Sequence, residues 1–226
     1  MTGGSIAFLS SGGGGNLRLV HALAASGALP KSRVTAVIAD RDCAALDWAR
    51  DLAIPTHQVA YRRDNPADMQ AILAEVDADI IVTNIHKILD EKLVARFAGR
   101  LLNLHYSMLP AFGGMIGMAP VRAARDLGCR LIGATAHLVT ASVDAGPILA
   151  QACVADSSER APEALYDDVF KCGGVALAVA IDTALHGGAA SGGTLDADHA
   201  RIFAAPLPRQ AIVDQMGSHD FWMALK

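Results

Sequence analysis

The stretch Leu101-Leu102-Asn103-Leu104-His105-Tyr106-Ser107-Met108-Leu109-Pro110 opens with a mostly apolar run that predicts a buried strand. Asn103 and His105 are two residues apart, so on a strand their side chains point to the same face. Residues 133–139 predict a second strand, with His137 near its end. The two strands therefore present an amide and two imidazoles in an otherwise apolar setting.

Asp144 follows the second strand in a loop bounded by Gly146 and Pro147. In an open α/β sheet, ligands bind in the crevice where strands end. We therefore expect Asn103, His105 and Asp144 to meet at such a crevice. Singly, a strand Asn or His is usually a hydrogen-bonded core residue, and an Asp before Gly-Pro is usually a turn residue. Together and in this order, they favour catalysis.

The same residues carry a family resemblance. The order Asn103-x-His105, Ser107-x-Leu109-Pro110, His137, and Asp144 before Gly146-Pro147 resembles the 10-formyltetrahydrofolate-dependent formyltransferases. Glycinamide ribonucleotide transformylases are the most similar group, and residues 131–151 equally resemble the formyltetrahydrofolate hydrolases. The resemblance covers about the first 185 residues and implies a folate-dependent transferase of one-carbon metabolism and purine biosynthesis.

The composition limits the class of protein. The chain has 226 residues, 52% hydrophobic and 19% charged, which suits one globular domain or a domain with a tail. A formal net charge of −4 leaves no basic surplus for nucleic acid or an anionic membrane. No apolar run is long enough to span a bilayer, and the N-terminus lacks the features of a signal peptide.

The cysteines give no sign of a metal site. No pair of them has the spacing of zinc ligands, and no acidic or cysteine pair accompanies the histidines at ligand spacing. We therefore expect no metal and interpret the cysteines as buried thiols of a protein in the reducing cytoplasm. They are Cys43, Cys129, Cys153 and Cys172.

The order of apolar segments predicts an α/β fold. A short apolar run, a glycine-rich loop and a helical pattern follow one another over residues 6–24, as at the start of a doubly wound fold. Residues 11–16 form this loop, which is called the glycine loop below. The resemblance makes this a Rossmann-like formyltransferase fold, with a mostly parallel central sheet and helices on both faces. We expect a catalytic domain over residues 1–186, then a Gly/Ala-rich linker and C-terminal tail over residues 187–226. A homodimer is a further possibility.

The glycine loop has two interpretations. Its glycines let a backbone or ligand approach closely, and the start of the following helix offers free N–H groups to an anion. Alternatively, it is only a tight turn. In the transformylases the matching loop holds the phosphate of the ribonucleotide, so the resemblance implies acceptor contacts at Gly14, Gly15 and Asn16.

The resemblance also implies the site of the formyl donor, 10-formyltetrahydrofolate. Main-chain groups of a strand-end segment line the pterin pocket in the family, because pterin presents a fixed face of donors and acceptors. Relatives often have Met-Arg where this chain has His86-Lys87, so a basic side chain is kept. The expected folate-binding residues are Ile85, His86, Lys87, Ile88, Leu89, Thr140, Ala141, Ser142, Val143 and Asp144.

Formyl transfer assigns a task to each polar residue. A side-chain amide such as Asn103 stabilises a developing oxyanion. The imidazole of His105 is cationic against that oxyanion or moves a proton. The carboxylate of Asp144 keeps the imidazole protonated and orients a water that carries a proton. His137 holds Asp144 in place without contacting the substrate itself.

The acceptor is a small-molecule amine whose identity stays open. Transformylases usually carry a Pro-Gly-x-His element where this chain has Gly113–Met118, and an acidic residue near Gly173; both are missing. Glycinamide ribonucleotide is the acceptor implied by resemblance, and a hydroxyornithine-type or amino-sugar amine suits the missing residues equally well. A formyltetrahydrofolate hydrolase, in which water replaces the amine, is an alternative. A non-catalytic folate-binding protein is an alternative of another class.

Overall fold

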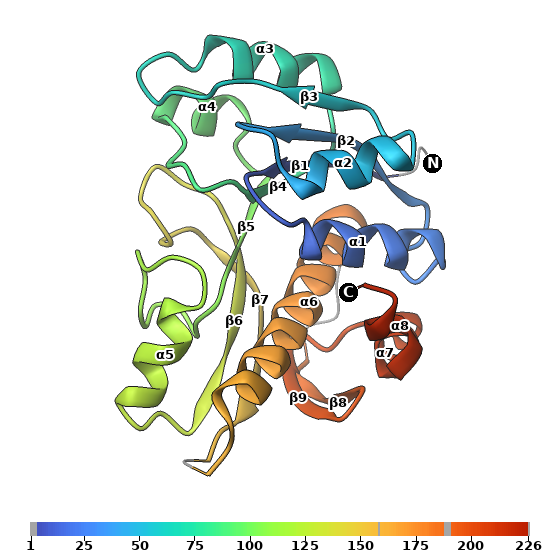
Figure 1. The fold of residues 1–226 in the computed structure, drawn as a ribbon, viewed down its shortest axis with the longest axis vertical. Coiled ribbons are helices and arrows are strands. Elements are labelled where there is room, and N and C mark those ends of the chain that lie inside the picture. The colour runs from blue at the N-terminus through green and yellow to red at the C-terminus, as the bar shows by residue number, and fades with distance from the viewer. Residues whose placement is uncertain (1–3, 158, 188–190, 226) are drawn as a thin grey trace.

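The computed structural model describes residues 4–157, 159–187 and 191–225. Within them, helices pack on a single sheet (Figure 1). The strands are β1 (Gly4–Ser10), β2 (Ser32–Ala39), β3 (Thr56–Gln58), β4 (Ile80–Asn84), β5 (Leu101–His105), β6 (Leu131–Leu138), β7 (Ile148–Ala155), β8 (Gly193–Ala197) and β9 (Ala200–Ala205). The helices are α1 (Gly15–Ala25), α2 (Ala44–Asp51), α3 (Ala67–Val76), α4 (Glu91–Arg96), α5 (Ala119–Asp126), α6 (Pro162–His186), α7 (Gln210–Gly217) and α8 (His219–Met223).

The sheet changes direction at its middle. Its strand order is β3-β2-β1-β4-β5-β6-β7-β9-β8, with parallel pairing from β3 to β5 and antiparallel pairing beyond β5. The predicted α/β class is confirmed, but the sheet is mixed rather than mostly parallel. The connections between β6 and β7 and between β8 and β9 are too short for the crossover that parallel neighbours require.

Helices cover both faces of the parallel half, as the sequence predicts. Ile6 and Phe8 of β1 pack in one cluster with residues of α1, α2 and α6. Ala7 and Leu9 point the other way and pack with residues of α3 and α4. This alternation follows from the two-residue period of a strand. All four side chains are fully buried, so β1 lies at the centre of the core.

Helix α6 is a long apolar helix of 25 residues. By length and composition it is apolar enough to cross a membrane, so the expectation that the chain lacks such a segment is wrong. However, 72% of its apolar window is buried inside the protein, where it packs on β6, β7 and α1. α6 therefore has the burial of a core helix, which is apolar around most of its circumference.

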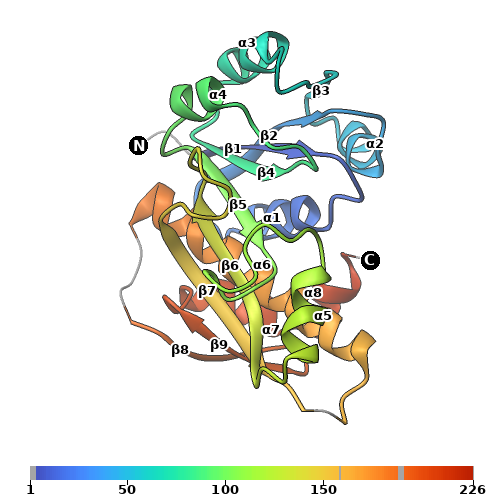
Figure 2. The same cartoon turned by 90° about the vertical axis from the view of Figure 1, so that its left-hand side faces the viewer.

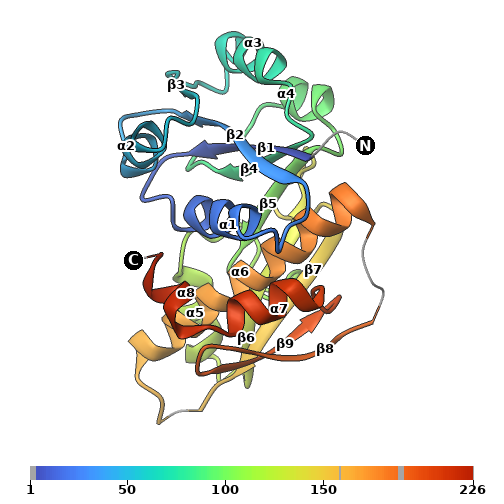
Figure 3. The same ribbon diagram turned by 90° about the vertical axis from the view of Figure 1, so that its right-hand side faces the viewer.

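The C-terminal segment belongs to the same sheet. β9 pairs with β7, and β8 pairs with β9 at the edge. Phe221 and Trp222 of α8 are buried in the main core, and Figure 3 shows α7 and α8 beside α6 and the β8–β9 hairpin. Residues 188–190 of the expected linker lie outside the described residues. The domain boundary after residue 186 stays a prediction.

Candidate active site

The polar residues meet over the seam where the sheet changes from parallel to antiparallel. β6 runs opposite to β5 and pairs His137 directly with Asn103, and Figure 2 shows the two strands side by side. Because of this direction, the loop after β6 starts beside Leu101, at the other end of β5, where the N–H of Val139 donates to the Leu101 carbonyl. The loop then folds back over the sheet and brings Asp144 to Asn103. The three groups therefore meet across a sheet face, rather than only at strand ends.

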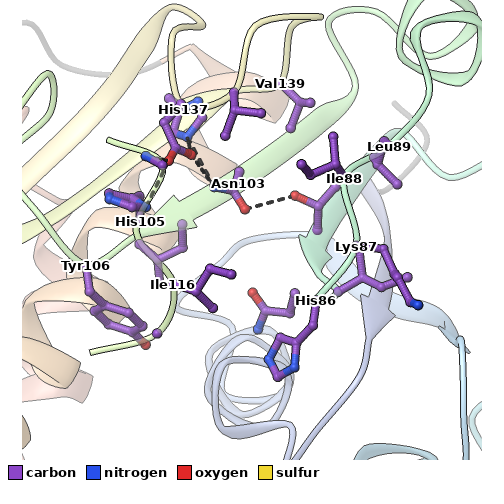
Figure 4. Close-up of a pocket in the computed structure, with 18 of the residues that line it drawn as sticks. His86, Lys87, Ile88, Leu89, Asn103, His105, Tyr106, Ile116, His137 and Val139 are labelled. Atoms are coloured by element: carbon purple, nitrogen blue, oxygen red, sulfur yellow. Dashed lines mark hydrogen bonds and ion pairs between the residues drawn. The ribbon is translucent and has the colours of Figure 1, made fainter. Parts of the chain in front are cut away.

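A cavity of ≈ 400 Å³ opens over this seam. The glycine loop, the segment after β4, the end of β5, residues 114–117 and the loop after β6 bound it. Figure 4 shows Asn103, His105 and His137 pointing toward one another from β5 and β6. Residues of the predicted donor site, of the predicted catalytic centre and of the glycine loop thus line one cavity.

The amide of Asn103 is held by partners on both sides. Its Oδ1 accepts a hydrogen bond from the Thr83 hydroxyl (3.1 Å). Its Nδ2 lies 3.2 Å from Nε2 of His137 and 3.5 Å from Oδ1 of Asp144. The two N–H groups of Asn103 therefore both have partners within the cluster, of which Asp144 is the more distant, and Asn103 lines the cavity.

Oxygen atoms face both ring nitrogens of His105. Nδ1 lies 3.3 Å from Oδ2 of Asp144, and Nε2 lies 3.1 Å from the carbonyl oxygen of Phe112. A carbonyl oxygen only accepts, and a carboxylate accepts when ionised, so both contacts are satisfied together when both nitrogens carry protons. The side chain is 7% exposed. The geometry therefore suits a cationic imidazolium that water barely reaches.

Asp144 joins the two histidines. Its Oδ1 lies 3.6 Å from Nε2 of His137, and its Oδ2 accepts a hydrogen bond from the Gly114 N–H (2.7 Å). The hydrogen bond from His137 lowers the pKa of the Asp144 carboxyl, and the Gly114 N–H and the charge of His105 act in the same direction against burial. Asp144 is therefore an ionised acceptor at neutral pH.

The loop that carries Asp144 is held in a strained and close-packed form. Asp144 itself has φ +53°, in the left-handed region that few non-glycine residues adopt. Two residues later, a Cβ at Gly146 would lie 1.8 Å from the Leu138 carbonyl oxygen, so only glycine fits. His137 is fixed in turn, because its Nδ1–H donates to the Leu138 carbonyl (2.9 Å) and leaves Nε2 for the cluster.

Two residues that the sequence did not single out fix the segment after His105. Thr135 lies opposite His105 on β6, donates to the Ser107 carbonyl (2.7 Å) and accepts from the Leu109 N–H (3.0 Å). Gln151 on β7 donates to the Leu109 carbonyl (3.0 Å). Only the pairing of β5, β6 and β7 reveals these contacts, because the residues lie far apart in the chain.

All ten predicted folate-binding residues line the cavity. They lie in the segment after β4 and in the loop after β6. Leu89 is buried, whereas Ile88 is 54% exposed at the edge of the cavity. The N–H of His86 donates to the Ser11 hydroxyl (2.9 Å), which ties the first segment to the glycine loop. Residues 85–89 and 140–144, which are far apart in the chain, thus line the same cavity.

The glycine loop is only partly as predicted. Gly14 and Asn16 line the cavity, but Gly15 is not among the lining residues, and a Cβ there would meet the Phe170 ring at 3.2 Å. Gly14 has φ +77°, and helix α1 begins after it with no side-chain cap and no acidic residue in its first turn. The first N–H groups of α1 therefore have no capping side chain as a partner.

One acidic cluster lies outside this site. Asp167, Asp168 and His199 place ligand-type atoms within 4.8 Å of one another, which no local spacing in the sequence indicated. The buried ammonium of Lys171 lies 3.0 Å from Asp167 and 3.2 Å from Asp198. A cation of the protein itself therefore already balances part of the charge of this cluster.

The protein has an α/β fold with a mixed sheet, and an amide, an imidazole and a carboxylate lie over the seam of this sheet, beside the glycine loop. These features define a class of small-molecule-binding α/β proteins with an acid–base centre. Within this class, the model of the family described as Formyl transferase matches residues 5–181, which is more than half of the chain. The chain belongs to the formyl transferase family.

Individual relatives agree with this assignment. The chain is 39% identical over 150 residues to the phosphoribosylglycinamide formyltransferase of Mycobacterium tuberculosis (63% of this chain, 67% of the relative). It is 33% identical over 141 residues to the formyltetrahydrofolate deformylase of Haemophilus influenzae (59% and 49%). The glycinamide ribonucleotide transformylase 1 structure from Symbiobacterium toebii matches with a TM-score of 0.74 at 30% identity (82% and 89%). The chain spans about a third to two thirds of the length of the curated relatives it matches.

Proposed function

We propose that this protein transfers a formyl group from 10-formyltetrahydrofolate to the amine of a small-molecule acceptor. The observation that carries the proposal is the contact of Asn103 and His105 with Asp144 in a cavity that both expected folate segments also line. Membership of the formyl transferase family supports the same chemistry.

The chemistry follows from the positions of the three polar groups. The nitrogen of the acceptor amine attacks the formyl carbon, and the carbonyl oxygen becomes an oxyanion in a tetrahedral intermediate. An N–H of Asn103 leaves its long contact with Asp144 (3.5 Å) and donates a hydrogen bond to this oxyanion. The positive charge of the protonated His105 ring stabilises the oxyanion through space, because its two N–H groups already face Asp144 and the Phe112 carbonyl. The bond between the formyl carbon and the folate nitrogen then breaks as the carbonyl forms again. The leaving folate nitrogen receives the proton that the amine loses.

Asp144 has two tasks in this scheme. As an ionised carboxylate 3.3 Å from His105, it stabilises the imidazolium. It also accepts a hydrogen bond from a water that takes the proton of the amine and gives it to the folate nitrogen. His137 and the Gly114 N–H hold the carboxylate in place and keep it ionised. Asp144 is therefore assigned to proton transport and His105 to charge stabilisation.

The donor pocket suits a flat heterocycle. Leu89 and Val94 give it an apolar side, and the backbone of residues 140–144 offers donors and acceptors on the other. His86 and Lys87 are exposed at its edge, where a basic side chain is able to meet the carboxylates of a folate tail. This arrangement supports 10-formyltetrahydrofolate as the donor.

The acceptor remains the open part of the proposal. Glycinamide ribonucleotide is the acceptor implied by the transformylase relatives, and hydroxyornithine-type and amino-sugar amines are the other candidates. The absence of the acceptor-binding His from Gly113–Met118 and of an acid at Gly173 favours a less phosphorylated amine. Two lost contacts of about 1.5–3 kcal/mol each lower affinity about a hundredfold or more. A homodimer and a cytoplasmic location stay predictions.

Hydrolysis of the formyl donor is the second candidate function. The similarity to a deformylase is the specific observation that favours it. In that reaction water replaces the amine, and formate leaves the same catalytic centre. A non-catalytic folate-binding role is the third possibility, and it requires that the contacts of His105 and Asp144 serve structure alone.

An acceptor screen with 10-formyltetrahydrofolate separates these functions. The measured quantities are tetrahydrofolate, formate and the formylated amine. Tetrahydrofolate release that depends on an amine supports the transferase, and formate release without an amine supports the hydrolase. Folate binding with no turnover in either assay, together with a normal melting curve, would leave only the binding protein.

A further inference from the structure

Tyr106 closes one end of the cavity. It follows His105 directly at the end of β5 and lines the cavity, and Figure 4 shows it on the opposite side of the site from Ile88 and Leu89. The end of the cavity that Gly12–Gly14, Asn16 and Tyr106 line is called the acceptor end below. The wall formed by residues 85–89 and 140–144 is called the donor end. His105 lies between them, and an acceptor that occupies the acceptor end lies next to Tyr106.

The Tyr106 ring rests on Gly173 of helix α6. A Cβ at residue 173 would lie 2.6 Å from Cε1 of the ring and 3.4 Å from its Cζ, and 3.1 Å from Leu104. Real Cβ atoms do not approach this closely, so a side chain at residue 173 and the ring of Tyr106 exclude each other. The glycine therefore lets an aromatic ring occupy space that a side chain from α6 would otherwise fill.

The hydroxyl of Tyr106 connects this ring to the glycine loop. It donates to Oδ1 of Asn16 at 3.5 Å, at the first turn of α1. Burial raises the pKa of Tyr106 to about 12, so the phenol is neutral at pH 7. Its oxygen keeps lone pairs for an acceptor hydroxyl or amine. Tyr106 therefore presents an uncharged side chain to the acceptor end.

The acceptor end also lacks a negative charge. Among the described residues that line the cavity, Asp144 is the one carboxylate, and it is engaged with His105 and the Gly114 N–H. A second cationic group close to the reacting nitrogen would find no counter-ion there. Bulk and charge are thus both restricted on the side from which the amine approaches.

We propose that Tyr106, seated on Gly173, determines acceptor specificity in the proposed formyl transfer. It admits a slender amine with uncharged groups beside the reacting nitrogen, as in hydroxyornithine, and excludes acceptors with a sugar ring at this place, such as glycinamide ribonucleotide. This inference rests on the proposed function and names the class of substrate.

Two variants of Tyr106 separate the bulk of the ring from the hydroxyl. Tyr106→Ala opens the acceptor end, whereas Tyr106→Phe keeps the ring and removes only the hydroxyl. We expect Tyr106→Ala to raise kcat/KM for glycinamide ribonucleotide relative to hydroxyornithine by about tenfold or more. Tyr106→Phe should keep the preference of the wild type for the slender amine. Tyr106→Leu is the second shortened variant, should the alanine protein fail to fold.

Binding measurements make the test independent of turnover. Calorimetric titration with the ribonucleotide should show affinity for Tyr106→Ala at least about tenfold above that of the wild type and of Tyr106→Phe. Equal affinity in all three folded proteins overturns the assignment of Tyr106. A lack of any amine-dependent turnover, with this affinity difference present, overturns formyl transfer but supports the steric role.

A double-mutant cycle tests the contact itself. Gly173→Ala should lower the melting temperature of the wild type, because its Cβ meets the Tyr106 ring. The same substitution should have a smaller effect in Tyr106→Ala, where the ring is absent. An equal effect in both backgrounds would show that residues 106 and 173 do not exclude each other.

Discussion

The donor end and the acceptor end of the cavity are built in different ways. At the donor end, consecutive residues of two loops line the wall, and their backbone supplies many of the polar groups. At the acceptor end, the ring of Tyr106, which follows β5, lies against Gly173 of α6 and its hydroxyl contacts Asn16 of α1. In the proposed function, donor binding therefore rests on local segments, whereas the proposed choice of acceptor rests on packing between distant elements.

The proposed catalytic centre between the two ends should give the largest effect. In the proposed mechanism, His105→Ala removes the cation that stabilises the oxyanion, and Asp144→Asn removes the negative charge that stabilises this cation. Each should lower turnover by about two orders of magnitude or more and leave the affinity for a folate analogue nearly unchanged. Steady-state assays measure turnover, and calorimetric titrations measure the affinity for the folate analogue. Asp47→Asn, on the exposed side of α2, is the matched control. Near-normal turnover in either folded variant removes that residue from the mechanism.

Folate binding should distinguish the donor end from the acceptor end. A folate analogue that seats between residues 85–89 and 140–144 binds only the folded protein and so stabilises it. At a hundred times the dissociation constant, the free energy of unfolding rises by about 2.7 kcal/mol, which a thermal melt detects. Tyr106→Phe should show the same shift. No shift at a saturating concentration of the analogue would contradict the donor site.

The loop after β6 folds back over the sheet and carries Asp144 to His105, and this path depends on Gly146. Gly146→Ala places a Cβ on the Leu138 carbonyl oxygen, so the loop must move and carry Asp144 away from His105. We expect a loss of about 2 kcal/mol in unfolding free energy, together with a fall in turnover. Chemical denaturation measures the first. Gly13→Ala is the control for stability, because its Cβ meets open space. Equal stability of both variants would show that the loop tolerates the displacement.

The smallest expected effect is a pH dependence of stability. Asp144 has a pKa below its ordinary value of 3.8, chiefly through the hydrogen bond from His137. A lowered pKa in the folded state adds stability above the unfolded-state value, and this contribution is lost as pH falls through the folded-state pKa. The difference in unfolding free energy between wild type and Asp144→Asn should therefore shrink as the pH drops below 3.8. Urea denaturation at several pH values tests this, and a constant difference would contradict it.

Local patterns predicted the parts of the site that depend on one element. The two-residue period of a strand put Asn103 and His105 on one face, and a glycine loop before an apolar periodic stretch predicted the start of α1. By contrast, burial alternates along residues 200–205 in the structure, but the sequence there is almost continuously apolar and shows no two-residue period. The sequence therefore predicts only a tail where the structure has β9.

The remaining contacts required the arrangement of whole elements. Asp144 reaches His105 only because β6 runs antiparallel and its loop folds back, and no residue pattern states the direction of a strand. The contact of Tyr106 with Gly173 depends on how α6 crosses the end of β5. The membrane-like composition of α6 has the same origin, because core burial and lipid favour the same residues.

The seam between β5 and β6 also has a consequence for folding. The partners it joins are far apart in the chain, 34 residues for Asn103 and His137 and 41 for Asn103 and Asp144, and such long loops close slowly. A slip of one residue in this pairing turns the imidazole of His137 to the opposite face. The same slip turns Ile132, Ala134 and Ala136 of β6 out of the core, so a compact chain with that slip would lack both the native packing of β6 and the polar cluster. Recovery of activity during refolding would therefore report the moment at which two antiparallel strands find their register, which bulk measures of compaction do not detect.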